Sequence, residues 1–146
     1  MKIERIAITR HRIDLDPSFY PVWDGRARDH FDATIVRVET DVGLVGIGSG
    51  DTMLGFAGHE DLFIGCDPLD LDRHHAILCN LNFHYGRCGP LDLALWDLAG
   101  KAAGQPVWKL IGGRGDRVWA FASSATLRDA AAMAETAQGF RDQGWP

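Results

Sequence analysis

Two aspartates between Pro90 and Gly113 are the first candidates for metal or acid–base chemistry. Asp92 and Asp97 are five residues apart, which on a helix of about 3.6 residues per turn separates them by roughly 140°. Ligands of one metal ion must converge, so this separation argues against a shared ion. Asp92 is better explained as a first-turn carboxylate that the helix dipole stabilises, and Lys101 as a last-turn cation.

A second candidate cluster consists of cysteine and histidine side chains between residues 66 and 88. Structural zinc sites usually hold their ligands in pairs two to four residues apart, and the cysteines show no such pair. We therefore expect reduced, mostly buried thiols in a cytoplasmic protein. The six side chains concerned are Cys66, Cys79, Cys88, His74, His75 and His84.

Composition excludes several classes of function. Of 146 residues, 46% are hydrophobic and 24% charged, as is usual for a soluble globular protein. Fifteen basic and twenty acidic residues give a net charge of −5 without a basic cluster, which argues against a nucleic-acid partner. No apolar run is long enough to span a membrane, and residues 1–5 do not resemble the start of a signal peptide. We expect a cytoplasmic protein with neither a membrane nor a nucleic-acid partner.

The strongest local pattern is an amphipathic helix that begins at Pro90. Gly89 is expected at its N-cap and Gly104 just beyond its end, with Pro106 blocking continuation. The apolar spacing of i, i+3, i+4 and i+7 places one set of side chains on a common buried face. This set is Leu91, Ala94, Leu95, Leu98 and Ala102.

The preceding residues predict a small sheet and further helices. Residues 2–15 read as a strand with a bulge near Arg10, and residues 16–30 as a long loop. Phe31–Thr40 and Leu44–Ile47 read as a hairpin around Asp41-Val42-Gly43. A short helix is expected at 59–64. A longer one is expected at 69–82, with Leu71, His74, His75 and Leu78 on one side.

The last part of the chain predicts a βα unit. Val118–Ala122 is a continuous apolar run, typical of a strand buried on both faces. A helix follows through Asp142, with Thr126 and Asp129 resembling its capping box. Ser123 and Ser124 end the predicted strand, and in barrels built from βα units the carboxyl ends of the strands form the catalytic rim. No base for a nucleophilic serine is identifiable, so we interpret Ser123 only as a contact at such a rim. Trp96 and Trp108 are better explained by packing than by cofactor binding.

The helix and its flank also carry a family resemblance. The run Asp92–Lys101, then Gly104-Gln105-Pro106 and Leu110–Gly113, resembles the mandelate racemase/muconate-lactonizing branch of the enolase superfamily, at the junction of capping domain and barrel. Two departures are Val42, where the turn often has a small or polar residue, and Ser49, where many members carry a glutamate.

The resemblance implies an α+β fold in two parts. Residues 1–113 would form a capping domain with an antiparallel three-stranded sheet and helices, and residues 114–146 the first βα unit of an incomplete (β/α)8 barrel. Enzymes of the family remove the proton α to a carboxylate with a Lys or His base and Mg²⁺. Their base and carboxylate metal ligands lie on later barrel strands, so we expect no catalytic or metal-ligating residue here. The chain alone should be inactive.

The resemblance also implies where a small carboxylate substrate would be contacted. Capping-domain loops close over the barrel mouth, and Phe19–Arg28 and Gly50–Phe56 occupy the corresponding places in the chain. Tyr20, Trp23 and Met53 would supply apolar wall, and Asp51 and Thr52 would bond substrate hydroxyls. Ordinary surface loops with aromatics packed beneath them are an equal alternative.

Three readings of the whole chain follow. The first is part of a Mg²⁺-dependent racemase, epimerase, cycloisomerase or acid-sugar dehydratase that forms a homo-oligomer when intact. The second is a stand-alone binding module with the capping fold, and the third an unrelated α+β domain. A stand-alone module should have lost the strand Val118–Ala122 or given it a partner, so the presence of this run favours the enzyme.

Overall fold

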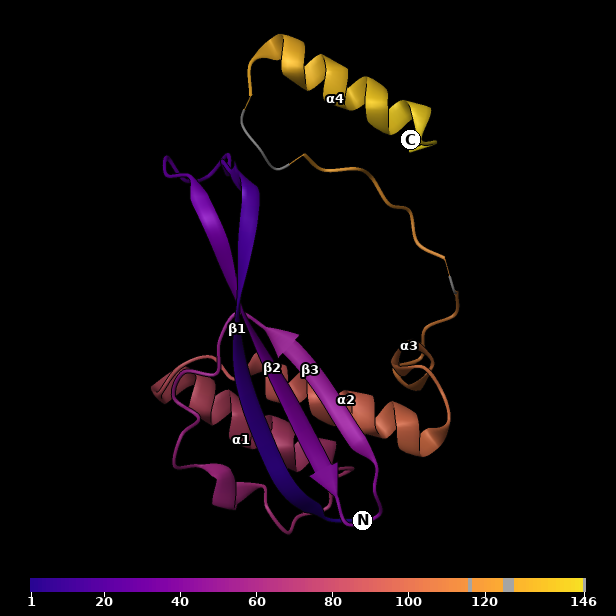
Figure 1. Cartoon of the computed structure of the whole chain (residues 1–146). Coiled ribbons are helices and arrows are strands. Elements are labelled where there is room, and N and C mark those ends of the chain that lie inside the picture. Colours follow the sequence, from indigo (N-terminus) through magenta and orange to yellow (C-terminus); the bar gives the residue numbers. More distant parts are fainter. Residues whose placement is uncertain (116, 125–127, 146) are drawn as a thin grey trace. The chain divides into compact units, whose positions relative to one another are not determined.

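The computed structural model describes residues 1–115, 117–124 and 128–145 (Figure 1). The chain divides into two compact units. One contains Met1–Arg12 and Asp32–Arg114, and the other Ile13–Phe31 and Gly115–Pro146. In chain order the elements are β1 (Ile3–Phe19), β2 (Arg28–Thr40), β3 (Val45–Gly50), the 3-10 helix η1 (Glu60–Leu62), α1 (Leu71–His84), α2 (Gly89–Ala103), α3 (Val107–Leu110) and α4 (Ala130–Asp142).

The three strands form one sheet in the order β1-β2-β3. β2 and β3 are antiparallel, with Val36 opposite Gly48 and Val38 opposite Gly46. The hairpin turns at Asp41–Gly43, where Gly43 has a φ of +79° and donates its N–H to the carbonyl of Thr40 at 3.0 Å. The predicted hairpin is confirmed, although its second strand begins one residue later and continues to Gly50.

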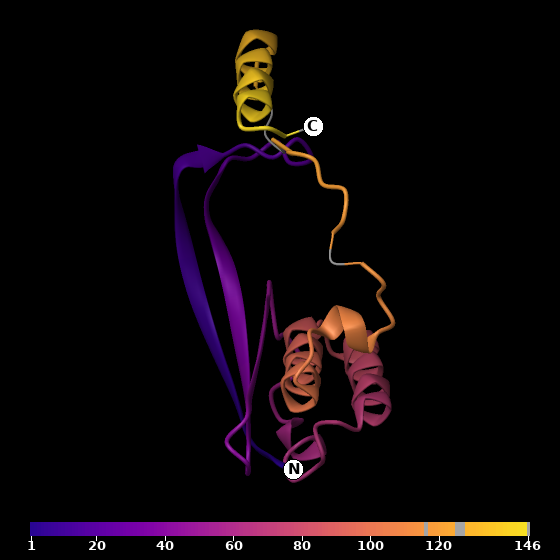
Figure 2. The same cartoon turned by 90° about the vertical axis from the view of Figure 1, so that its right-hand side faces the viewer.

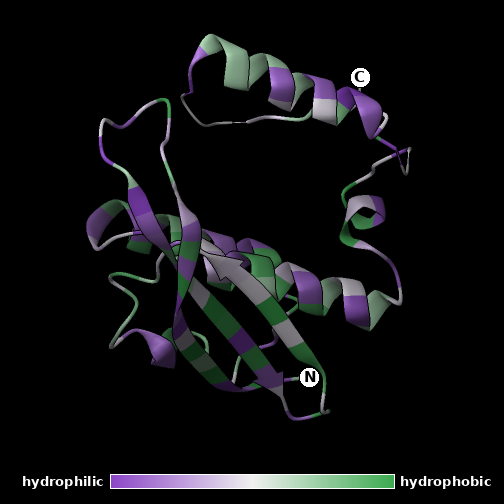
Figure 3. Cartoon of the chain, turned by 45° about the horizontal axis from the view of Figure 1, so that its top comes forward, coloured by the Kyte–Doolittle hydropathy of each residue, from purple (hydrophilic) through white to green (hydrophobic). Residues whose placement is uncertain are grey.

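Hydrophobic and hydrophilic residues alternate along β2 (Figure 3), so one face of the sheet is apolar. The helices α1 and α2 lie side by side on that face (Figure 2). Contact between α2 and β3 is close because β3 carries glycine where the helix crosses it. A Cβ on Gly46 would meet the carbonyl of Ala94, and one on Gly48 that of Pro90.

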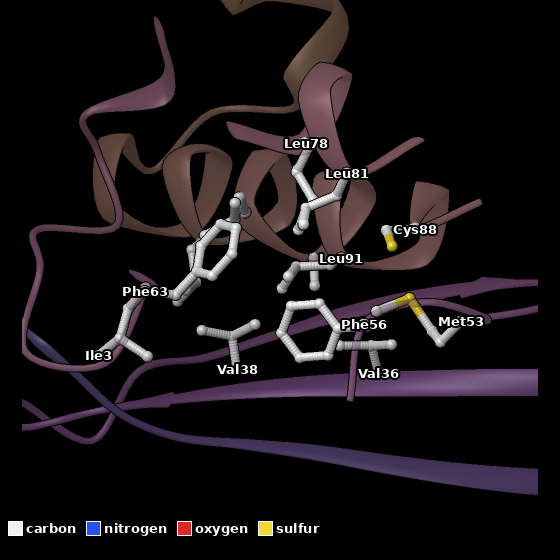
Figure 4. Packing of buried hydrophobic residues seen from close by; sticks show 13 residues of the cluster. Ile3, Val36, Val38, Met53, Phe56, Phe63, Leu78, Leu81, Cys88 and Leu91 are labelled. Carbon is white, nitrogen blue, oxygen red and sulfur yellow. The ribbon is translucent and has the colours of Figure 1, made fainter. Parts of the chain in front are cut away.

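The core lies between this face and the two helices. Figure 4 shows Val36 and Val38 of β2 beneath Leu91 of α2, with Phe56 and Phe63 from the segment before α1. Its remaining buried hydrophobic members are Ile3, Met53, Leu78, Leu81, Cys88, Ala94, Leu95 and Leu98.

The prediction for α2 is confirmed at its C-terminal end and largely in its buried face. The helix begins at Gly89 after the N-cap Cys88, one residue earlier than expected, and ends at Ala103, followed by the C-cap Gly104 with a φ of +61°. Four of the five predicted positions are buried, but Ala102 is exposed. In the last turn the buried side is formed by Ala99 and Gly100 instead, because the chain turns back so that Val107 packs against Gly100.

Two predicted segments had wrong boundaries. The loop expected at 16–30 is confined to residues 20–27, since β1 runs through Asp16-Pro17 to Phe19 and β2 starts at Arg28. Proline is tolerated there because β1 is an edge strand of the sheet. The helix expected at 69–82 is Leu71–His84.

The two neighbouring histidines of α1 differ in burial. His74 is fully buried, stacks on Phe63, and its Nε2 hydrogen-bonds the carbonyl of Asp67 at 2.8 Å. His75 is exposed, so the prediction that it shares one side of the helix with His74 and Leu78 was wrong. One step along a helix turns a side chain by about 100°, which is enough to move it from the core to solvent.

The strand predicted at Val118–Ala122 does not form. Residues 117–124 have no regular secondary structure, and Trp119 is 97% exposed. A strand needs a neighbour for its backbone hydrogen bonds, and the described sheet ends at β1 and β3. The predicted helix is present as α4, whose N-cap Asp129 accepts the N–H of Ala132 at 2.9 Å. Thr126 of the predicted capping box lies outside the described residues.

Candidate functional site

A polar cavity of about 400 Å³ in the first unit contains two of the predicted site residues. Asp51 and Thr52 line it from the segment that follows β3. β1 and β2 form the other walls. The remaining lining residues are Arg10, His11, Arg12, Asp32, Thr34 and Leu54.

Hydrogen bonds fix the backbone on the Asp51 side of this cavity. The buried Thr34 donates its hydroxyl to the carbonyl of Asp51 at 3.4 Å. The hydroxyl oxygen of Thr52 accepts the N–H of Leu54 at 3.0 Å, which leaves the Thr52 hydroxyl proton available to a ligand. The segment is therefore held in place at the cavity that Thr52 lines.

An ion pair joins the cavity to a neighbouring one. The Asp51 carboxylate lies 2.6 Å from the guanidinium of Arg87. Both side chains also line a second cavity of about 450 Å³ beside the start of α2, together with Ser49 and Asp92. The Asp51 carboxylate is therefore already paired with a cation. Its remaining lone pairs can accept a hydrogen bond from a hydroxyl or ammonium group of a ligand.

The cavity wall carries both signs of charge. Arg10 and Arg12 are two residues apart on β1, and Asp32 and Asp51 supply carboxylates. Guanidinium groups bind carboxylates and hydroxyl oxygens, and carboxylates accept from hydroxyl or ammonium groups. The arrangement can therefore hold a small, polar molecule with several hydrogen-bonding groups.

Tyr20 and Trp23 belong to the second compact unit. Trp23 is 64% exposed and contacts Phe19 at a ring distance of 6.0 Å. Phe19 in turn contacts Phe31 at 5.8 Å. The tip between β1 and β2 is thus an aromatic cluster with Trp23 and Tyr20 turned largely to solvent.

Met53 is a core residue, so its prediction as exposed pocket wall was wrong. Its side chain is only 4% exposed and lies with Phe56 and Val36 in the core (Figure 4). The prediction failed because Met53 follows two polar residues in a glycine-rich segment, a pattern typical of an exposed loop. Burial here depends on packing against α1 and α2, which are distant in sequence.

Sequence reasoning missed Arg10, Arg12, Asp32 and Thr34. Each lies on a strand, whereas the predicted site residues lie in two loop segments. A usable signal was present, because residues two apart on a strand point to the same face, and Arg10 and Arg12 follow this spacing. Arg87 was missed as well, since nothing local indicates that it reaches Asp51.

No group of three or more histidine, cysteine, aspartate or glutamate side chains converges within residues 1–115, 117–124 and 128–145. Asp97 hydrogen-bonds the N–H of Ile47, whereas Asp92 lines the second cavity, so the two aspartates have separate surroundings. Magnesium needs several oxygen ligands, and this part of the chain does not fit it.

The cysteines also occupy separate environments. Cys66 is half-buried, Cys79 exposed and Cys88 buried. Burial raises the pKa of the Cys88 thiol. Cys79 has His75 at 3.3 Å on the same exposed side of α1. Among the described helices, none has the length and apolar character to cross a membrane.

The fold and the α2 sequence together define a capping domain of the enolase type, and comparison with known proteins supports this class. Residues 87–112 match the family "Mandelate racemase / muconate lactonizing enzyme, N-terminal domain". The cis-3-hydroxy-L-proline dehydratase of Roseibium aggregatum is 31% identical over 99% of this chain and 43% of its own length.

Solved structures match the fold over nearly the whole chain. The N-succinyl Arg/Lys racemase of Bacillus cereus has a TM-score of 0.78 at 26% identity, over 98% of this chain and 42% of that one. A Roseovarius nubinhibens protein assigned to the mandelate racemase/muconate-lactonizing enzymes, complexed with magnesium, has a TM-score of 0.80 at 29% identity, over 99% and 43%.

The chain belongs to the enolase superfamily and carries the N-terminal domain of its mandelate racemase/muconate-lactonizing branch. Its relatives are dehydratases, epimerases and racemases. It spans less than half the length of the curated relatives that it matches.

Proposed function

We propose that this chain is the capping part of a Mg²⁺-dependent enzyme that abstracts the proton α to a carboxylate. The single observation that carries the proposal is the capping fold with its α2 signature, in a chain whose sequence relatives are enzymes of three reaction types. Dehydration, epimerisation and racemisation can all begin with loss of an α-proton, so the shared fold supports a reaction class and not one substrate.

The chain's own contribution would be substrate selection. Asp51 and Thr52 would bond substrate hydroxyl or amino groups in the polar cavity, where the Thr52 hydroxyl donates to no acceptor among the described residues. Tyr20 and Trp23 would supply apolar surface from the tip between β1 and β2. Loops that close over a substrate exclude water and complete the pocket, which suits two exposed aromatics on a hairpin tip.

We include Mg²⁺ in the proposal because the structure of a relative was solved with that ion. The described residues hold no fitting ligand set, so we assign no metal-dependent step to them. Val118–Ala122 and α4 would be the first βα unit of a barrel after a capping domain of residues 1–113. In that setting neighbouring strands would cover the exposed apolar run. Assembly into a homo-oligomer belongs to the same proposal.

The alternative is a binding module without catalysis. The exposure of Val118, Trp119 and Phe121 weighs against it, because a self-sufficient module seldom leaves a continuous apolar segment in water.

Turnover assays on two proteins test the proposal. One protein is the 146-residue chain, and the other is translated from the complete native reading frame that contains this sequence. Both are given acid sugars, N-acyl amino acids, dipeptides and hydroxyprolines with Mg²⁺ or with EDTA. We expect turnover only by the complete protein, only with Mg²⁺. Equal turnover by the short chain, or turnover that EDTA leaves unchanged, would contradict the assignment.

A further inference from the structure

β3 is an edge strand whose outward backbone groups can be identified from its register. The sheet order is β1-β2-β3, and Thr40 donates its N–H to the carbonyl of Leu44. In an antiparallel ladder, hydrogen-bonded pairs alternate with pairs whose N–H and C=O groups point away from the partner. Val45, Ile47 and Ser49 therefore direct their backbone groups away from β2. Such an edge is a template for another strand.

Two side chains of α2 reach this edge. The Ile47 N–H donates to Oδ2 of Asp97 at 2.7 Å, and Nζ of Lys101 donates to the carbonyl of Val45 at 2.7 Å. The same Nζ lies 2.6 Å from Oδ2 of Asp97. One edge donor and one edge acceptor are thus occupied by a carboxylate and an ammonium group that also neutralise each other.

The backbone of β3 allows this arrangement. Gly46 and Gly48 point toward α2 and have no Cβ, so the helix approaches the strand closely. Asp97 and Lys101 are four residues apart and lie on the same side of α2. From there both reach the free edge of the strand on which the helix rests.

We propose that the Asp97–Lys101 pair closes the β3 edge against pairing with β3 of a second copy of this chain. A two-fold antiparallel pairing would offer the same groups from both copies, and it needs the Val45 carbonyl and the Ile47 N–H. The side chain of Ile47 is 46% exposed on the opposite sheet face from α2. Two copies of this β-branched residue would add apolar contact to an open edge.

Amide hydrogen exchange of the unaltered chain provides the first test. Ile47 and Ser49 have the same backbone direction, but only the Ile47 N–H has a side-chain acceptor within the described residues. We expect the Ile47 amide to exchange at least about tenfold more slowly, in line with a charge-assisted hydrogen bond. Equal rates for the two amides would overturn the proposal.

The second test uses the double variant Asp97→Ala/Lys101→Ala, studied by light scattering over a range of concentrations. We expect a concentration-dependent doubling of mass relative to the unaltered chain, with the Ile47 amide protected in the larger species. The control is Arg5→Ala/Glu39→Ala, which removes an ion pair of 3.3 Å between β1 and β2. It leaves Asp97 and Lys101 in place, so the mass should be unchanged.

A folded double variant with unchanged mass at every concentration would overturn the proposal, as would equal association by the control. If circular dichroism shows that the double variant is unfolded, the single variant Lys101→Ala replaces it. Asp97 then still binds Ile47, so we expect weaker association through Val45. No gain in mass by that folded variant, together with equal exchange of Ile47 and Ser49, would also refute edge closure.

Discussion

At the scale of single residues, two large apolar side chains that were predicted for the same substrate pocket differ in burial. Met53 and Trp23 both lie beside strand ends, but Met53 is in the core and Trp23 is 64% exposed. We expect Met53→Ala to lower the free energy of unfolding by about 2–5 kcal/mol, as for other buried large-to-small changes. Urea denaturation measures this. A loss below about 0.5 kcal/mol, typical of surface changes, would place Met53 outside the core.

Trp23→Ala should leave stability almost unchanged and alter substrate selectivity instead. We expect its unfolding midpoint to remain near that of the unaltered protein, because an exposed side chain contributes little to stability. In the protein from the complete reading frame, selectivity among substrates should change by about ten- to two-hundredfold, because the loss of one apolar contact in a pocket changes selectivity by that factor. Val42→Ala, at the exposed turn between β2 and β3, is the control. Unchanged selectivity in Trp23→Ala would place the pocket elsewhere.

The Cys88 thiol makes stability depend on pH. Burial raises its pKa in the folded state, so the folded chain keeps this proton at a pH where the unfolded chain has lost it. The stabilisation is complete below the pKa of the unfolded thiol. It is lost as pH rises through the higher pKa of the folded state. We expect urea midpoints to fall through the alkaline range, and to fall less in Cys88→Ala. An equal decline in both would assign the effect to other groups.

At the scale of elements, the contact of β3 with α2 depends on residues without side chains. A Cβ on Gly48 would collide with the backbone of α2, whereas one on Gly89 would meet nothing within 4 Å. We expect Gly48→Ala to cost about 1–3 kcal/mol, as for overpacked sites, and Gly89→Ala to be close to neutral. Thermal denaturation of both variants tests this. Equal losses would mean that helix and strand are not in close contact.

The segment 117–121 should lack protection in the chain alone. It has no regular backbone hydrogen bonding, and Val118, Trp119 and Phe121 are exposed. We expect these amides to exchange at the rate of an unstructured peptide while those of Val36 and Val38 on β2 remain protected. Protection of both segments would show that the apolar run has found a partner, such as a second copy.

α2 and the segment Val118–Ala122 differ in how well the sequence alone predicts their structure. α2 could be predicted because its periodicity, its proline and its terminal glycine all lie within sixteen residues, Gly89–Gly104. Val118–Ala122 has the composition of a buried strand, but strand formation requires a partner that composition does not specify. The same limit applies to the site. Asp51 and Thr52 were found from their place after β3, whereas Arg10, Arg12 and Asp32 join them only through the pairing of strands.

At the scale of the whole molecule, the family assignment and the proposed activity rest on different observations. The capping domain is defined by its sheet, its helices and its match over residues 87–112. The activity is an inference from relatives more than twice as long as this chain. A decisive measurement must therefore detect the proposed chemical step without assuming a substrate or a product.

Exchange of the substrate α-proton with solvent deuterium is that measurement. The protein from the complete native reading frame is incubated in deuterated water with a panel of carboxylates, and mass spectrometry records deuterium at the α-carbon. We predict incorporation into at least one carboxylate with Mg²⁺, its loss with EDTA, and none with the 146-residue chain alone. Absence of incorporation into every carboxylate by the folded, Mg²⁺-loaded protein would contradict the proposed chemistry.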